Sequence, residues 1–306
     1  YGITVRWDKN FLRLIQVSLL RRPTYQLYGG VRFGGTLTLE DAWALGLDHV
    51  ALATGTGLPK VLPIGNSLAR GMRQATDFLM ALQLTGAGKT SSLANLQLRM
   101  PVVVIGGGLT AIDTATEAQA YYLKQVEKTL ARCVALAAAQ GEAAIWAGLN
   151  AEDTEILREF LTHGQAVQAE RQRAAAAGER PDFLPLLRAW GGVTLVYRKG
   201  LNSSPAYLRN HEEITQALAE GLYYRAGLEP LRLELDAFGH TQALVCRKLK
   251  AEAGRWLATR EEMTLPAKAV LVAAGAQPNI IYEKEHPGHF QLEGDHFLPH
   301  ICHQDA

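Results

Sequence analysis

The stretch Val102-Val103-Val104-Ile105-Gly106-Gly107-Gly108-Leu109-Thr110-Ala111-Ile112-Asp113 decides the fold. Its β-branched run predicts a strand buried on both faces, and the residues from Ala111 onward predict a helix. Between them, Gly106-x-Gly108-x-x-Ala111 matches the strand–turn–helix motif that binds a dinucleotide. The first glycine makes the tight turn, the second lets the backbone approach a pyrophosphate, and the small third residue lets helix and strand pack closely. The helix N-terminus then offers N–H groups to the phosphates. The alternative is a tight turn without a ligand.

A second strand is predicted over Val193-Thr194-Leu195-Val196-Tyr197, and Arg198-Lys199 follow it directly. In dinucleotide-binding folds this position usually carries an acidic residue that binds the ribose hydroxyls of NAD. A carboxylate would repel a 2′-phosphate, whereas an arginine holds a phosphate bidentately. Arg198 and Lys199 therefore favour NADP(H) over NAD(H). The alternative is that both residues only solvate a loop.

The two motifs lie much further apart than the roughly 20 residues usual for this fold. The Ala-rich segment 117–190 separates them, and its pattern predicts two or three helices with breaks near Gly141, Gly148–Asn150 and Gly178–Pro181. We expect it to be a helical insertion, since long insertions in surface connections cost little entropy. The alternative is a domain that ends near residue 120.

The rest of the chain adds elements but no second motif of comparable weight. Helices are expected over 9–21, from Thr38 as a cap, over 73–84 and over 207–220. Buried strands that end in glycine are expected over 48–55 and 269–275, and further strands over 222–225, 231–236 and 242–249, the last two joined at Phe238-Gly239-His240.

Composition excludes several classes of protein. The 306 residues carry 31 Lys and Arg against 30 Asp and Glu, so a strongly basic nucleic-acid binder is not expected. No apolar run approaches the roughly 18–20 residues of a membrane span, and no signal peptide is recognisable, so we expect a cytoplasmic location. Cys133, Cys246 and Cys302 form no disulfide framework. Gly86-Ala87-Gly88-Lys89-Thr90 lacks the strand and the first glycine of a P-loop. The C-terminal histidines match no metal-site spacing, and we expect no metal.

Taken together, the motifs resemble a known family. They are Tyr1-Gly2-Ile3, Ala53-Thr54-Gly55, the Val-Ile-Gly-Gly-Gly-x-Thr-Ala-x-Asp of 104–113, the Val-Thr-Leu-Val-Tyr-Arg-Lys of 193–199 and the Ala-Ala-Gly-x-x-Pro-Asn of 273–279. The chain resembles the FAD-dependent pyridine nucleotide-disulphide oxidoreductase superfamily, and more closely the branch with the small (beta) subunit of NADPH-dependent glutamate synthase. The resemblance covers about 1–116 and 191–285.

The resemblance implies an α/β fold, namely a Rossmann-like NAD(P)-binding domain with a parallel sheet and a β-meander, inserted within an FAD-binding domain. Residues 1–97 would be a partial FAD-binding domain and linker, 98–276 the NADP(H)-binding domain with the insertion 117–190, and 277–306 a return segment toward the FAD-binding domain. NADPH would give a hydride to FAD, and electrons would pass on to an iron–sulfur domain or subunit. The cofactor-binding residues implied are Gly106, Gly107, Gly108, Leu109, Thr110 and Ala111 for the pyrophosphate, Arg198 and Lys199 for the 2′-phosphate, and Ala274, Gly275, Thr54 and Gly55 where chain and cofactors meet.

The sequence departs from that family in two respects. The family's second G-x-G-x-x-G, which binds FAD, is not found, and neither are the clustered cysteines of iron–sulfur domains. We therefore expect an internal fragment that binds NADP(H), holds FAD weakly or not at all, and is inactive alone. No catalytic acid or base is assigned, because the cofactors carry the hydride chemistry. The alternatives are a docking module whose helical insertion binds a partner subunit, and an NADP-dependent dehydrogenase without flavin.

Overall fold

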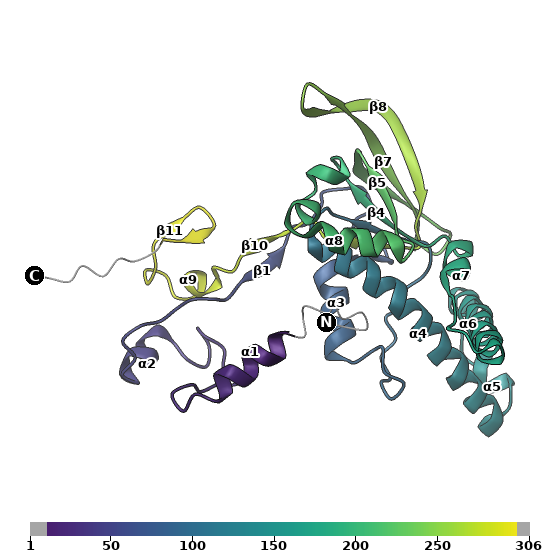
Figure 1. Cartoon of the computed structure of the whole chain (residues 1–306), viewed down its shortest axis with the longest axis horizontal. Coiled ribbons are helices and arrows are strands. Elements are labelled where there is room, and N and C mark those ends of the chain that lie inside the picture. The colour runs from purple at the N-terminus through teal and green to yellow at the C-terminus, as the bar shows by residue number, and fades with distance from the viewer. Residues whose placement is uncertain (1–10, 299–306) are drawn as a thin grey trace, which may run out of the picture. The chain divides into compact units, whose positions relative to one another are not determined.

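The computed structural model describes residues 11–298, and these divide into two compact units. One unit contains residues 61–274, and the other contains 11–60 together with 275–298. Each unit is considered by itself, and its elements can be followed in Figure 1. Residues 61–97 are expected in the partial FAD-binding domain, but they fall in the first unit. There β2 (Met72–Gln74) pairs with a strand of the sheet and α3 (Ala75–Leu84) packs on it.

The first unit is built on a parallel five-stranded sheet. Its strands besides β2 are β3 (Val102–Ile105), β4 (Val193–Tyr197), β5 (Tyr223–Ala226) and β9 (Ala269–Val272). Their order is β2-β9-β3-β4-β5, and every neighbouring pair is parallel. All residues of β3 and β9 are buried, as their continuous apolar runs require. The α/β fold with a parallel sheet, predicted from the sequence, is confirmed.

Helices cover one face of this sheet. α3, the first half of α4 (Leu109–Gln140) and α8 (Pro205–Ala219) share a core with Val102, Val104, Leu195 and Leu271. α4 runs through 32 residues without a break, and Lys128 is the last of its buried residues. The expected insertion therefore does not start at residue 117, since 117–128 belong to the core and only the later part of α4 extends beyond it.

The rest of the insertion contains α5 (Ala143–Trp146), α6 (Ala151–Ala177) and α7 (Leu184–Ala189). The helix breaks predicted at Gly141, Gly148–Asn150 and Gly178–Pro181 are confirmed. Asn150 caps the N-terminus of α6, where its side chain accepts a hydrogen bond from the Asp153 N–H, and Gly178 caps the C-terminus in the left-handed conformation.

An ionic cluster fixes α6 to the sheet. Arg99, which is 2% exposed, donates to Glu159 at 2.7 Å and to Glu155 at 3.2 Å, and Lys268 donates to Glu159 at 2.6 Å. Arg99 precedes β3 and Lys268 precedes β9, so the cluster lies at the amino ends of the strands. Beside it, the Tyr122 hydroxyl contacts Nδ1 of His163 at 2.5 Å, and the His163 ring stacks on Trp190.

A β-meander packs on the other face of the parallel sheet. It consists of β6 (Leu228–Leu235), β7 (Thr241–Glu252) and β8 (Arg255–Pro266) in the order β6-β7-β8. Its buried residues Leu233, Leu244 and Cys246 join those of the sheet in a second core. The predicted turn at Phe238-Gly239-His240 is confirmed. β8 was not predicted, because its turn at Ala253-Gly254 places an alanine at φ +47°, a conformation that alanine seldom adopts.

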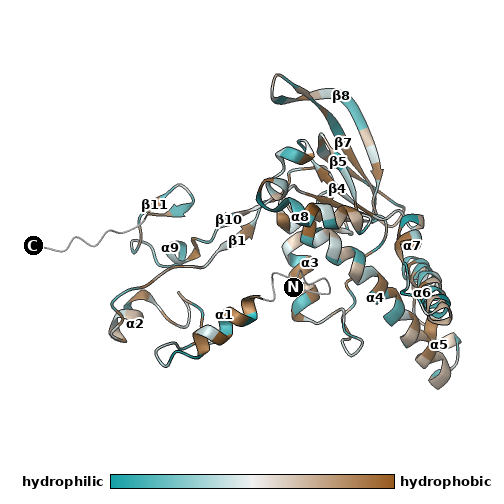
Figure 2. Cartoon of the chain, viewed as in Figure 1, coloured by the Kyte–Doolittle hydropathy of each residue, from teal (hydrophilic) through white to brown (hydrophobic). Residues whose placement is uncertain are grey.

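The second unit has short elements and little buried surface. It contains α1 (Phe11–Leu20), α2 (Leu39–Ala44), β1 (Thr56–Pro59), β10 (Ala276–Pro278), α9 (Ile281–Glu285), β11 (Leu292–Glu293) and β12 (His296–Phe297). Thr38 caps α2 as predicted. Every residue of α1 is exposed, although much of the helix is hydrophobic (Figure 2).

The strand predicted over 48–55 is wrong. These residues have no regular structure and are mostly exposed, and β1 begins only at Thr56, where it pairs with β10. Within residues 11–298, the apolar run of 50–53 has no neighbouring strand that would complete a buried ladder. Among the described helices, none is long and apolar enough to cross a membrane.

Candidate cofactor-binding site

The glycine turn lies where the order of the parallel strands reverses. From β3 the chain passes through α4 to β4 on one side, and it later returns to β9 on the other side of β3. In open α/β sheets such a switch point leaves a crevice at the carboxyl ends of the strands, and ligands bind there. Gly106 directly follows β3, so the turn from Gly106 to Gly108 sits at the strand end where such folds bind their ligands.

Two of the three glycines are required by packing. A Cβ on Gly106 would lie 2.5 Å from the Ala273 carbonyl oxygen, and a Cβ on Gly107 would lie 2.4 Å from the ring of Tyr197. The Gly106 N–H donates to the Val196 carbonyl at 3.0 Å, which fixes the turn to the end of β4. Only glycine fits either position without moving its neighbours. Ala111, fully buried, provides the small residue at which α4 approaches the turn.

Gly108 differs, because a Cβ there would meet nothing within 4 Å. It is the N-cap of α4 and offers no side chain to the helix N-terminus. The N–H groups of Leu109 and Thr110 lie in the first turn, where no intrahelical acceptor exists. Thr110 is exposed and Leu109 half-buried. Open space, unpaired donors and the positive end of a long helix dipole together fit a bound pyrophosphate.

Arg198 and Lys199 follow β4 beside this turn. The parallel pairing of Ile105 with Val196 brings the end of β4 level with Gly106, and the next residue, Tyr197, packs on Gly107. Both cations are exposed, and neither forms an ion pair with any residue that the structure describes. The structure therefore brings the predicted 2′-phosphate residues to the same edge of the sheet as the predicted pyrophosphate residues.

The remaining predicted site residues divide between the two units. Ala274 follows β9 and packs half-buried on the second core of the sheet unit. Gly275, Thr54 and Gly55 belong to the other unit, where Thr54 Oγ1 donates to the Asn279 carbonyl at 3.3 Å and the Asn279 N–H donates to the Gly55 carbonyl at 2.9 Å. Their role beside a cofactor stays a prediction.

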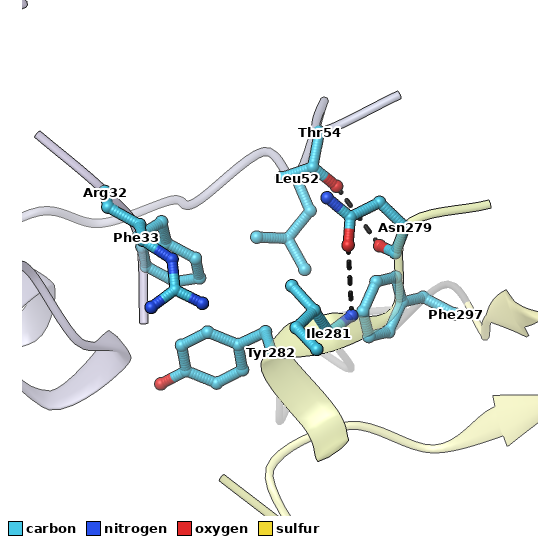
Figure 3. A pocket seen from close by; sticks show the side chains of 8 residues that line it. All are labelled: Arg32, Phe33, Leu52, Thr54, Asn279, Ile281, Tyr282 and Phe297. Atoms are coloured by element: carbon cyan, nitrogen blue, oxygen red, sulfur yellow. Dashed lines mark hydrogen bonds between the residues drawn. The ribbon is translucent and has the colours of Figure 1, made fainter. Parts of the chain in front are cut away.

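The second unit has a small cavity of its own, of about 240 Å³. Figure 3 shows the side chains that line it, which are Arg32, Phe33, Leu52, Thr54, Asn279, Ile281, Tyr282 and Phe297. Phe33 stacks on Tyr282 at 4.6 Å, and Arg32 binds both oxygens of Glu285 at 2.7 Å. Apart from Thr54, none of these residues is predicted from the sequence, because the walls of the cavity come from segments more than 200 residues apart.

The cavity does not fit a whole dinucleotide. Ligand pockets usually measure about 300–1,000 Å³, and in the described residues of this unit no glycine turn joins a strand to a helix. Among the described residues, the glycine turn of the sheet unit is therefore the candidate phosphate cradle, and the second unit offers none.

Metal ligands and reactive thiols are not apparent among residues 11–298. No three His, Cys, Asp or Glu side chains gather there in a way that would hold a metal ion. Burial raises the pKa of the Cys133 thiol, and that of Cys246 to about 12, so neither favours a thiolate. His300, Cys302 and His303 of the C-terminal histidine tract lie outside the described residues.

Comparison with known proteins identifies a relative in sequence and several solved structures that are similar in fold. No family model matches the chain. An uncharacterised protein of Rickettsia prowazekii (strain Madrid E) is 40% identical over 244 residues, which are 80% of this chain and 32% of that protein. The chain thus spans about a third of the length of this curated relative.

The solved structures that resemble the chain are distant. Mycobacterium tuberculosis FprA in complex with NADPH is 16% identical with a TM-score of 0.48, over 89% of this chain and 59% of that one. Thioredoxin reductase from T. acidophilum is 13% identical with a TM-score of 0.37, over 79% and 48%. A FAD-dependent pyridine nucleotide-disulphide oxidoreductase from Desulfovibrio vulgaris is 13% identical with a TM-score of 0.36, over 78% and 38%. At such distances the chemistry of this chain has to be argued from its own residues, and the glutamate synthase branch stays a prediction.

Proposed function

We propose that this chain binds NADP(H) at the carboxyl ends of β3 and β4, as the nucleotide-binding part of a flavin-dependent oxidoreductase. The observation that carries the proposal is the open backbone at Gly108, where an added Cβ would meet no heavy atom within 4 Å. It lies at the switch point of the sheet, at the N-terminus of α4, with two unpaired cations on the neighbouring strand end. A dinucleotide with an additional phosphate matches both parts of this arrangement.

Each part of the site has its own task. The N–H groups of Leu109 and Thr110 bind the pyrophosphate, and Arg198 and Lys199 bind the 2′-phosphate. The nicotinamide supplies the hydride chemistry when bound, and this chain contributes binding and orientation. Gly106 and Gly107 hold the turn in a shape that needs no rearrangement when the nucleotide arrives.

In the intact protein, a bound FAD would accept the hydride from NADPH, and the electrons would then pass to an acceptor such as an iron–sulfur domain or subunit. The second unit is proposed as part of the FAD-binding domain, but its described residues offer no cradle for the FAD pyrophosphate. We therefore expect this chain alone to hold FAD weakly or not at all and to be inactive alone. Purified chain with stoichiometric flavin absorbance near 450 nm would contradict this part.

The location is proposed to be cytoplasmic.

Calorimetric titration with NADPH and NADH tests the central proposal. Arg198→Ala should weaken NADPH binding about tenfold to a hundredfold, because it removes charge-assisted hydrogen bonds to the 2′-phosphate. NADH binding should stay unchanged. Arg209→Ala is the matched control, since Arg209 is an exposed arginine of α8 in the same unit.

Two results would reject the proposal. Equal affinity for both coenzymes, unaffected by Arg198→Ala, would remove the 2′-phosphate assignment. No binding of either coenzyme would favour the alternative of a docking module, in which the sheet is a scaffold and the helical insertion binds a partner subunit.

A further inference from the structure

The outer half of the β7–β8 hairpin extends beyond a break in its ladder. Arg247 pairs with Glu262 and Leu249 with Ala258, so residues 259–261 lie opposite the single residue Lys248. Thr259 Oγ1 donates to the Lys248 carbonyl at 2.8 Å, and Lys248 Nζ donates to Glu261 at 2.9 Å, which closes the bulge. Bulges bend the strand that carries them and redirect its side chains. The projecting hairpin is seen in Figure 1.

Beyond the bulge, the ring of Trp256 packs on two glycines of the sheet unit. A Cβ on Gly227 would lie 2.8 Å from Cζ3 of this ring, and a Cβ on Gly200 would lie 3.6 Å from Cζ2. The Leu249 N–H also donates to the Gly227 carbonyl at 2.7 Å. Gly227 follows β5 and Gly200 follows β4, so one half-buried indole ties the hairpin to the loops at two adjacent strand ends.

Gly200 directly follows the two cations of the proposed 2′-phosphate site. On its other side the chain enters the short 3₁₀ helix Leu201–Ser203, where the Ser203 N–H and Oγ both donate to the Gly200 carbonyl, at 3.1 and 2.9 Å. The loop is thus held at Gly200 by the indole and by Ser203, while Arg198 and Lys199 themselves stay exposed. Neither of these two side chains forms an ion pair with any of the described residues.

We propose that Trp256 is a positioning residue for 2′-phosphate recognition: by packing on Gly200 it fixes the backbone from which Arg198 and Lys199 reach the phosphate. This rests on the proposed function and deepens it. A binding loop that is already ordered avoids the cost of ordering it when the ligand arrives. Removing the indole should therefore weaken binding of ligands with a 2′-phosphate and leave binding of ligands without one unchanged.

The test compares 2′,5′-ADP with 5′-AMP, which lacks only the 2′-phosphate, as ligands of the intact chain, by calorimetry. Trp256→Ala should lower the affinity for 2′,5′-ADP about fivefold or more without changing that for 5′-AMP. Trp256→Phe should restore most of the loss because it keeps an aromatic ring. Trp146→Ala is the matched control. Trp146 is equally half-buried and lies beyond the far end of α4, a helix of 32 residues or roughly 48 Å.

Tryptophan fluorescence gives a second readout that needs no truncated variant. Binding of 2′,5′-ADP should change the fluorescence of the wild-type chain, and Trp256→Phe should abolish that change while Trp146→Phe keeps it. The outcomes separate the two proposals. If the wild type binds both ligands equally or not at all, the proposed function fails. A second outcome overturns only the role of Trp256. In it, the wild type prefers 2′,5′-ADP and Arg198→Ala loses this preference, but the Trp256 variants keep both the preference and the fluorescence change.

Discussion

Glu159→Gln should destabilise the sheet unit far more than the same substitution at Glu155 on the same helix. Both carboxylates bind Arg99, whose side chain is 2% exposed, but Glu159 is 12% exposed and Glu155 is 58% exposed. Glu159 also accepts from Lys268 at 2.6 Å. Burial raises the pKa of Glu159, but the hydrogen bonds and charges of Arg99 and Lys268 outweigh it and leave the pKa below its ordinary value. The carboxylate is therefore charged in the folded chain.

The expected magnitude follows from this difference in burial. Removing one partner of a buried ion pair costs about 3–5 kcal/mol, because the other charge stays buried without compensation. Glutamine keeps one hydrogen-bond acceptor and Glu155 keeps part of the compensation, so we expect about 3 kcal/mol for Glu159→Gln. An exposed pair contributes about 0–1 kcal/mol, so Glu155→Gln should lie in that range.

Urea and thermal unfolding followed by circular dichroism measure both variants. For a domain of about 150–250 residues, 1 kcal/mol corresponds to roughly 2–4 °C, so the Tm of Glu159→Gln should fall by roughly 6–12 °C and that of Glu155→Gln by a few degrees at most. Similar small shifts in both variants would refute the reasoning, since Arg99 would then be compensated by other groups. Similar large shifts would show that exposure does not separate the two carboxylates.

The remaining predictions concern the glycine turn and the half-buried His163. Gly107→Ala should destabilise the fold by about 1–3 kcal/mol, because its Cβ would lie 2.4 Å from the Tyr197 ring. Gly108→Ala should fold normally but bind NADPH at least about tenfold more weakly, because its methyl group would occupy the open space at the α4 N-terminus. Equal effects of the two substitutions on thermal unfolding would contradict this expectation. Burial lowers the pKa of His163 in the folded chain, so on acidification the unfolded chain binds a proton at this residue before the folded chain does. The free energy of unfolding should therefore fall as the pH drops from about 6.5 through the folded-state pKa. Urea unfolding between pH 7.5 and 5.5 should show this slope in the wild type and in His211→Gln, an exposed control, but not in His163→Gln; an unchanged slope in His163→Gln would assign it to another group.

The sequence predicts the parts of this molecule that are encoded locally. The β3–turn–α4 segment is recognisable because a β-branched run, three glycines and a helix start follow one another within twelve residues. The strand expected over 48–55 failed for the opposite reason. Its apolar run is typical of a buried strand, but burial depends on neighbours that the run itself does not specify.

Contacts between distant segments explain the other differences. An arginine such as Arg99 is expected on the surface. It is buried because α6, some sixty residues later in the chain, packs against it and supplies two carboxylates. The role of Trp256 was hidden for two reasons. The turn at Ala253 uses a conformation that its sequence does not suggest, and the indole packs on glycines that precede it by several elements. The cation pair Arg198-Lys199, in contrast, could be placed from its position directly after a predicted strand.

The unbroken course of α4 gives the molecule a long rigid rod that starts at the glycine turn. A rod of roughly 48 Å amplifies small rotations. A tilt of about 5° at its first turn displaces its other end by roughly 4 Å, by the same length. Movements too small to detect at the turn itself are therefore readable at the α4–α5 end, where a pair of spectroscopic labels would report them as a change in distance.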